Sequence, residues 1–181
     1  MAEFSRTEDV PRYAELMIQG LKEAGVSIVT ALPESLLKSL YRLLVADPDI
    51  RYVLVANEGE MPGIAAGAYL GGKKSVMIME NSGLRQALEP IARFALSHRV
   101  PLVMLMPYRG DFGEKTWWGH SHAQTMEPIL NALNIPYRVV RRLDDIKPAI
   151  SKVVTHADSS QYPAAVIFAD ECLETPSYAK D

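Results

Sequence analysis

The fold is decided by the stretch Arg51-Tyr52-Val53-Leu54-Val55-Ala56-Asn57-Glu58 and by the small-residue run that follows it. The apolar, β-branched part predicts a buried strand of a parallel sheet over Arg51–Ala56. Pro62 fits best in the first turn of a helix, which we expect over Met61–Leu70. A strand, a short turn and a helix in this order form the repeating unit of an α/β fold.

Strand and helix patterns alternate along almost the whole chain. Five further strands are expected, over Ser27–Leu32, Lys74–Met79, Val100–Met106, Tyr137–Val140 and Ala164–Phe168. Five further helices are expected, over Val10–Ala24, Glu34–Val45, Leu84–Ser97, Met126–Leu133 and Leu143–His156. Each crossover must carry the chain back across the sheet, so we expect a three-layer, doubly wound, mostly parallel α/β fold with helices on both faces. Because no repeat or linker interrupts the pattern, residues 1–181 are expected to form a single domain.

The composition favours a soluble cytoplasmic protein. The formal net charge of −3 gives no basic footprint, so nucleic acid is not expected as a partner. The longest apolar stretch, Val100–Met106, is too short to span a bilayer, so no membrane association is expected. Residues 1–9 are polar and charged, which argues against a signal peptide. The single cysteine, Cys172, indicates a reducing compartment, and no activating neighbour pattern surrounds it.

Glu58 is the first candidate for chemistry. Open α/β sheets bind ligands beyond the carboxyl ends of their strands, which is where Glu58 is expected. Apolar walls around a carboxyl group raise its pKa, so that it holds or shares a proton near neutral pH. The alternative is a solvated loop acid. The small residues between Gly63 and Ala68 suit close packing, either against a partner subunit or against the sheet.

Two further strand ends carry candidate groups. Asn81-Ser82-Gly83-Leu84-Arg85 stands immediately before a helix, where free amides and the helix dipole favour an anion. The alternative for Asn81 or Ser82 is an ordinary helix cap. Arg109 suits an anionic group through its planar fork of donors, or it forms an ion pair with Asp111 or Glu114.

A long loop is expected from Pro107 to Gln124. Loops longer than about 12–15 residues are usually functional or disordered. This one has an unlikely composition for disorder, because it contains Trp117, Trp118, His120 and His122. Histidines titrate near neutral pH, and a two-residue spacing in a loop can place both on one pocket wall. No further ligands follow at the spacing of a zinc site, so no metal is expected on this chain's side chains alone.

Three of these strand ends together resemble the pyrimidine-binding domain of thiamine-diphosphate-dependent 2-oxoacid decarboxylases. The segments are Val55–Glu60, Met79–Leu84 and Met106–Asp111, and Ala31–Leu37 and Leu133–Tyr137 also fit. The likeness runs from Val10 to Phe168 and is greatest to the sulfopyruvate and phosphonopyruvate decarboxylases. It implies a carboxy-lyase with thiamine diphosphate as its cofactor.

The resemblance also assigns roles. Glu58 matches the family's glutamate, which hydrogen-bonds N1′ of the aminopyrimidine and so promotes deprotonation of the thiazolium C2. The implied cofactor contacts are Asn57, Glu58, Ser82 and Gly83. The implied catalytic residues are Glu58, His120 and His122, of which the histidines match groups that contact substrate or intermediate. Charge and position make Arg85 and Arg109 candidate ligands of a sulfonate or phosphonate group.

A partner subunit is the last implication. The family binds Mg²⁺ and the diphosphate on a second domain that contains Gly-Asp-Gly and a later asparagine. The only Gly-Asp here is Gly110-Asp111, followed by Phe112. We therefore expect an alpha subunit that is active only with a diphosphate-binding beta subunit, on which the Mg²⁺ ligands lie, in a hetero-oligomer.

The expected reaction is the conversion of 3-sulfopyruvate to sulfoacetaldehyde and CO2, or of phosphonopyruvate to phosphonoacetaldehyde. Two alternatives stay open. One is a thiamine-diphosphate enzyme subunit for another 2-oxoacid or for carboligation. The other is a non-catalytic module that binds a ligand or partner, against which the intact Glu58 argues because a buried acid costs stability.

Overall fold

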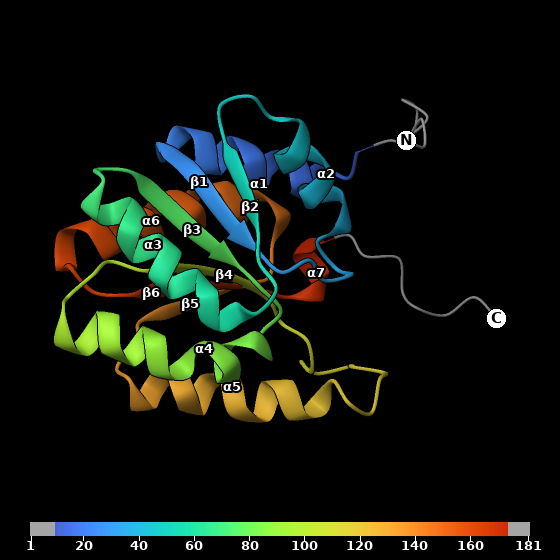
Figure 1. Cartoon of the computed structure of the whole chain (residues 1–181). Helices are drawn as coiled ribbons and strands as arrows, with labels where there is room; N and C mark the ends of the chain where they lie inside the picture. Colours follow the sequence, from blue (N-terminus) through green and yellow to red (C-terminus); the bar gives the residue numbers. More distant parts are fainter. Residues whose placement is uncertain (1–9, 174–181) are drawn as a thin grey trace.

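A six-stranded parallel sheet forms the centre of the structure, a computed structural model that describes residues 10–173 (Figure 1). Residues 1–9, on which the signal-peptide prediction rests, and residues 174–181 lie outside the described range. The strand order is β2-β1-β3-β4-β6-β5, and all neighbouring strands pair in parallel. The strands are β1 (Val26–Ala31), β2 (Arg51–Leu54), β3 (Lys74–Ile78), β4 (Val103–Pro107), β5 (Tyr137–Val140) and β6 (Ala164–Phe168).

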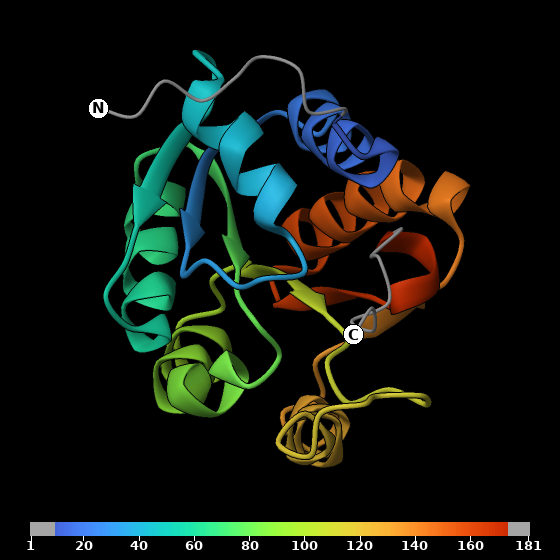
Figure 2. The same cartoon turned by 90° about the vertical axis from the view of Figure 1, so that its right-hand side faces the viewer.

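Helices cover both faces of this sheet (Figure 2). One face packs against α1 (Arg12–Glu23), α2 (Lys38–Ala46), α6 (Ile146–Ser160) and α7 (Asp170–Leu173). The other face packs against α3 (Met61–Leu70), α4 (Gly83–Ala92) and α5 (His120–Ala132). Three short turns complete the described elements: the 3₁₀ turns η1 (Glu58–Glu60) and η3 (Leu143–Asp145), and the π turn η2 (Arg93–Ser97). The predicted three-layer α/β class is confirmed.

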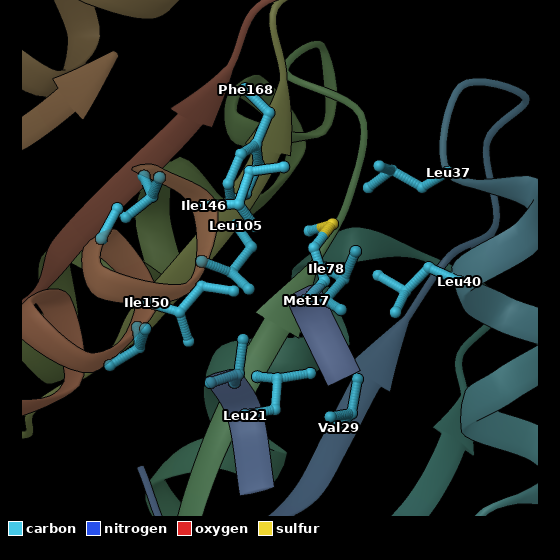
Figure 3. Close-up of a cluster of buried hydrophobic side chains, with 14 of the residues drawn as sticks. Met17, Leu21, Val29, Leu37, Leu40, Ile78, Leu105, Ile146, Ile150 and Phe168 are labelled. Carbon is cyan, nitrogen blue, oxygen red and sulfur yellow. The ribbon is translucent and has the colours of Figure 1, made fainter. Parts of the chain in front are cut away.

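The sheet separates two apolar cores, because successive side chains of a strand point to opposite faces. In β3, Ile78 faces the core shared with α1 and α6, whereas Met77 faces the core shared with α4 and α5. Figure 3 shows the first core, in which Met17, Leu21, Ile146 and Ile150 from the helices meet Val29, Ile78, Leu105 and Phe168 from the strands. Strands that are apolar on both faces are typical of a covered parallel sheet.

The connections that leave β1 and its neighbours diverge, and this divergence positions the candidate site. After β1 the chain goes to α2 on one face, whereas after β2 and β3 it goes to α3 and α4 on the other. Parallel α/β sheets bind ligands at such points, where neighbouring strands send their connections to opposite faces. The ends of β1, β2 and β3 carry Glu34, Glu58 and Glu80 respectively.

Several boundaries differ from the prediction, and two of them affect the site. The helix α2 begins at Lys38 instead of Glu34, because the Glu34 carboxylate accepts hydrogen bonds from the backbone N–H groups of Leu36 and Leu37 and holds a turn there. The helix α5 begins at His120 instead of Met126, so the predicted long loop ends at Gly119. Within residues 10–173, no helix combines the length and the apolar character needed to cross a membrane.

Candidate active site

Glu58 begins the turn that joins β2 to α3. Asn57 precedes it in an extended conformation, and its side-chain oxygen accepts a hydrogen bond of 2.7 Å from the Gly59 N–H. Asn57 therefore caps the turn η1 in the way that asparagine caps helices. Pro62 lies in the first turn of α3, as predicted. The Glu58 side chain is half-buried, and within residues 10–173 its carboxyl group has no hydrogen bond or ion pair, which leaves it available to a ligand.

Gly83 makes room for that carboxyl group. A Cβ atom added to Gly83 would lie 2.6 Å from Cγ and 2.8 Å from Oε1 of Glu58. The same close approach continues at Gly59, where a Cβ would lie 3.3 Å from the carbonyl oxygen of Gln86 in α4. The turn after β2 thus packs directly on the start of α4, and two predicted site residues, Glu58 and Gly83, are in contact.

Glu80, at the end of β3, joins two more of the predicted residues. Its Oε1 accepts a hydrogen bond of 2.8 Å from the Ser82 hydroxyl group and lies 3.0 Å from Nδ1 of His122. The His122–Glu80 contact is close enough for an ion pair but is not aligned for a hydrogen bond. Burial lowers the pKa of His122 below its usual value, against the opposing effect of Glu80. His122 is therefore a neutral imidazole near neutral pH, able to accept or pass a proton.

His120 and His122 do not line the same wall of a pocket. Both lie in the first turn of α5, where residues two apart point about 200° away from each other. His122 is 8% exposed and faces the site, whereas His120 is exposed. The expectation that both line one pocket rested on a loop conformation, which the helix replaces.

Arg109 is buried at the end of β4, with only 5% of its surface exposed. Its guanidinium group donates a hydrogen bond of 2.9 Å to the Ser35 hydroxyl, lies 3.9 Å from the Glu114 carboxylate and stacks over the indole of Trp118. Trp118 in turn contacts the ring of His122, with 5.4 Å between the ring centroids. Of the two ion pairs considered from the sequence, the one with Glu114 is present.

Asn81 links the ends of β3 and β4. Its side-chain N–H₂ donates a hydrogen bond of 2.8 Å to the carbonyl oxygen of Arg109. Its Oδ1 is fully buried and has no hydrogen-bond partner among the described residues. A buried acceptor of this kind is costly and is common where a ligand or water supplies the missing donor.

Arg85 approaches the cluster of Arg109, Trp118 and His122 from α4, and in addition to burial its charge helps to lower the pKa of His122. Its exposed guanidinium group donates hydrogen bonds of 3.2 Å to the carbonyl oxygen of Ser121 and to the hydroxyl of Thr125. Arg85 thus ties α4 to the first turns of α5. It lies two residues beyond Gly83, so it remains at the same edge of the sheet.

Glu34 also belongs to the site, although the sequence motifs did not predict a functional role for it. Burial raises the pKa of Glu34 to about 7, with Glu80 adding to the shift and the two backbone N–H donors and Arg109 opposing it. Its position soon after a predicted strand, which is also the position of Glu58, is the feature of the sequence that indicates such a role. Among residues 10–173, no three His, Cys, Asp or Glu side chains gather in a way that could hold a metal ion.

Comparison with known proteins agrees with this geometry. Residues 11–116 match the thiamine pyrophosphate enzyme family, N-terminal TPP binding domain, where thiamine pyrophosphate is another name for thiamine diphosphate. Sulfopyruvate decarboxylase subunit alpha of Methanococcus maripaludis is 29% identical over 85% of this chain and 92% of its own length. The protein of the same name from Methanothermobacter thermautotrophicus is 30% identical over 77% of this chain and 85% of its own length.

Phosphonopyruvate decarboxylase of Streptomyces viridochromogenes is 38% identical over 55% of this chain, but the match spans only 25% of that longer protein. The family match covers more than half of the chain and includes the ends of β1, β2, β3 and β4, where Glu34, Glu58, Gly83 and Arg109 lie. With its parallel sheet and a carboxyl group at the sheet edge, this chain belongs to the thiamine pyrophosphate enzyme family.

Proposed function

We propose that this chain is the pyrimidine-binding alpha subunit of a heteromeric thiamine-diphosphate-dependent decarboxylase that acts on 3-sulfopyruvate or phosphonopyruvate. The observation that carries the proposal is the Glu58 carboxyl group, which has no partner among the described residues and lies against Gly83. The names of the relatives from Methanococcus maripaludis, Methanothermobacter thermautotrophicus and Streptomyces viridochromogenes support the choice of substrates.

The residues present fit an aminopyrimidine. A carboxyl group can bond a ring nitrogen, the missing side chain of Gly83 leaves space beside it, and the buried Asn81 Oδ1 lacks a donor. When bound, thiamine diphosphate supplies the electron sink into which the carbon–carbon bond pair passes as CO2 leaves. Glu58 holds and exchanges the proton of the ring nitrogen, while Asn57 fixes the turn that carries it, and Ser82 and Gly83 form the adjoining wall.

Arg109 and His122 are proposed to serve the substrate. The guanidinium group of Arg109 provides a positive charge and N–H donors for a sulfonate or phosphonate, and Arg85 adds positive charge at the same edge. His122, neutral and beside Glu80, carries a proton to or from the reacting carbon atoms. His120 is exposed and points away from this cluster, and its catalytic role stays a prediction.

The helix α3 supports the need for a partner. It consists almost entirely of apolar residues, yet Gly63 and Gly67 face open space, since a Cβ on either would have no neighbour within 4 Å. Leu70 at its end and Leu54 of β2 are also largely exposed. Exposed apolar residues that gather on one part of a surface are typical of a subunit interface. We propose that a diphosphate-binding beta subunit completes the enzyme and supplies the Mg²⁺ ligands.

Reconstitution tests the proposal. The chain is mixed with the companion subunit that carries Gly-Asp-Gly, and CO2 release from sulfopyruvate and phosphonopyruvate is measured with thiamine diphosphate and Mg²⁺. We expect no turnover by the isolated chain and a loss of about 10²–10⁴-fold in kcat for Glu58→Gln, the range for removal of a general acid or base. Glu60→Gln, in the same turn, is the control and should retain activity. Full activity of Glu58→Gln would remove this residue from the mechanism.

A further inference from the structure

The segment Asp111–Gly119, here called the aromatic loop, joins β4 to α5 and presents aromatic side chains to solvent. Phe112 is fully exposed and Trp117 is 85% exposed. In Figures 1 and 2 this yellow segment extends beyond the sheet before it enters α5. Large aromatic side chains in open solvent are costly, and when they lie on a well-ordered loop they are typical anchors of protein interfaces.

The Glu114 carboxylate fixes the conformation of the aromatic loop through hydrogen bonds within it and to the residue that precedes it. The carboxylate accepts hydrogen bonds from the Gly110 N–H (3.0 Å), the Thr116 N–H (2.9 Å) and the Thr116 hydroxyl (2.7 Å). Burial favours a higher pKa for Glu114, but these hydrogen bonds and Arg109 outweigh it and hold the pKa below its usual value. Gly119 has no room for a side chain, because a Cβ there would lie 2.7 Å from the Glu114 carboxylate.

An ion pair fixes the start of the loop. The Asp111 carboxylate lies 2.7 Å from the guanidinium group of Arg141, which follows β5. Glu114 at its centre and Asp111 at its start thus fix the observed conformation of the loop. In this conformation the side chains of Phe112 and Trp117 are presented to solvent.

The loop is continuous with the candidate site. Trp118, which is 38% exposed, lies over the Arg109 guanidinium and contacts the His122 ring, whereas its neighbour Trp117 is 85% exposed. Because Trp117 is the immediate neighbour of Trp118, a subunit that docks on Trp117 comes close to the edge of the sheet where Arg109 and His122 lie. Of the possible occupants, the subunit that must supply the remaining cofactor contacts is the one required at this edge.

The lengths of the relatives favour the same occupant. The chain matches 92% of a protein named subunit alpha but only 25% of a phosphonopyruvate decarboxylase. What the longer protein carries in one chain must come from another subunit in the shorter ones. We propose that Phe112 and Trp117 are the aromatic anchor by which this chain binds its diphosphate-binding partner subunit, an inference that rests on the function proposed above.

The two tryptophans of the chain, Trp117 and Trp118, allow a direct test. The chain labelled with 5-fluorotryptophan should give two ¹⁹F resonances, which Trp117→Phe and Trp118→Phe assign. On titration with the purified companion subunit that carries Gly-Asp-Gly, the Trp117 resonance should shift and lose its H₂O/D₂O isotope effect. This readout does not depend on turnover, so an inactive complex with a shifted Trp117 would count against the proposed reaction and leave the anchor standing.

Affinity gives the second measurement. Phe112→Ala with Trp117→Ala should weaken the complex by about a hundredfold in sedimentation or calorimetry, because interface anchors of this kind typically account for tenfold or more each. Leu96→Ala, which removes an exposed apolar side chain in η2, is the matched control and should change affinity less than about twofold.

Three outcomes would overturn the proposal. The Trp117 resonance could stay unchanged in an active complex, which would separate the anchor from the reaction. It could shift with protein concentration without the partner, which would indicate a second copy of this chain. It could shift with pyruvate alone, which would indicate a lid over the chain's own site.

Discussion

Gly83→Ala tests the geometry of the site more sharply than removal of Glu58 does. The new Cβ would lie 2.6 Å from Cγ of Glu58, whereas carbon atoms pack at about 3.5–4.0 Å. Glu58 must therefore withdraw by about 1 Å. A misplacement of that size can cost about 10²-fold in rate, so we expect kcat of the reconstituted enzyme to fall by roughly this factor.

The same substitution should leave the fold intact. Gly83 lies in a helix at a φ that any residue adopts, so alanine should contribute up to about 1 kcal/mol in helix propensity. Overpacking costs about 1–3 kcal/mol in a rigid core, but the atoms that the Cβ meets belong to a flexible glutamate. We expect the free energy of unfolding of the isolated chain, measured in urea, to stay within about 1–2 kcal/mol of wild type.

A double-variant cycle decides whether Gly83 acts through Glu58. If it does, adding Gly83→Ala to Glu58→Gln should slow CO2 release no further, since coupled residues are not additive. A further hundredfold loss of rate in the double variant would mean that the alanine side chain at position 83 disturbs a group other than Glu58. Wild-type activity of Gly83→Ala would refute the argument, because a displaced carboxyl group could not be part of the mechanism.

Two further predictions concern titrating groups. The raised pKa of Glu34 means that its contribution to stability is present below about pH 4.5 and is lost as pH rises through about 7, by up to about 3 kcal/mol. Glu34→Gln should remove that loss when urea unfolding is compared at pH 5 and pH 8, and an unchanged difference would contradict the burial of this acid. His122→Gln should lower kcat by about 10²-fold and abolish the decline in rate as pH falls through the lowered pKa of His122, whereas His120→Gln should change kcat less than about twofold. Equal effects of the two histidine variants in the same pH–rate assay would contradict the assignment of the catalytic role to His122 alone.

The sequence was sufficient for the parts of the site that depend on local signals. Strand β2 and helix α3 are marked by an apolar run, by Pro62 and by small residues, all within a few positions of Glu58. These signals place Asn57 and Glu58 at a strand end without any knowledge of the neighbours. Strands β5 and β6 were predicted at their observed bounds for the same reason. The prediction that strand β2 is buried was wrong, because β2 is an edge strand whose Arg51 and Leu54 are exposed.

Contacts of polar side chains account for the two element boundaries near the site that the apolar pattern did not predict. The first turn of α5 is polar and lacks helical periodicity, and contacts from other elements hold it: Arg85 to Ser121 and Thr125, and Glu80 to His122. The start of α2 shifts because a side chain, Glu34, replaces the helix's own hydrogen bonds. Neither effect appears in a pattern of apolar positions. The first depends on which elements become neighbours, and the second is a local hydrogen bond of a polar side chain.

The charges around Arg109 explain how an acidic cluster can accept an anion. Arg109 interacts with the carboxyl groups of Glu34, Glu114 and Asp170. Burial raises the pKa of Glu34 to about 7 and also raises that of Asp170, so that near neutral pH both hold protons more readily than exposed acids do. Glu114 stays ionised and bound within the aromatic loop. A sulfonate or phosphonate approaching Arg109 would add negative charge and raise the pKa of Glu34 further. Proton uptake by Glu34 would then offset the repulsion, which makes Glu34 part of the electrostatics of the proposed substrate site.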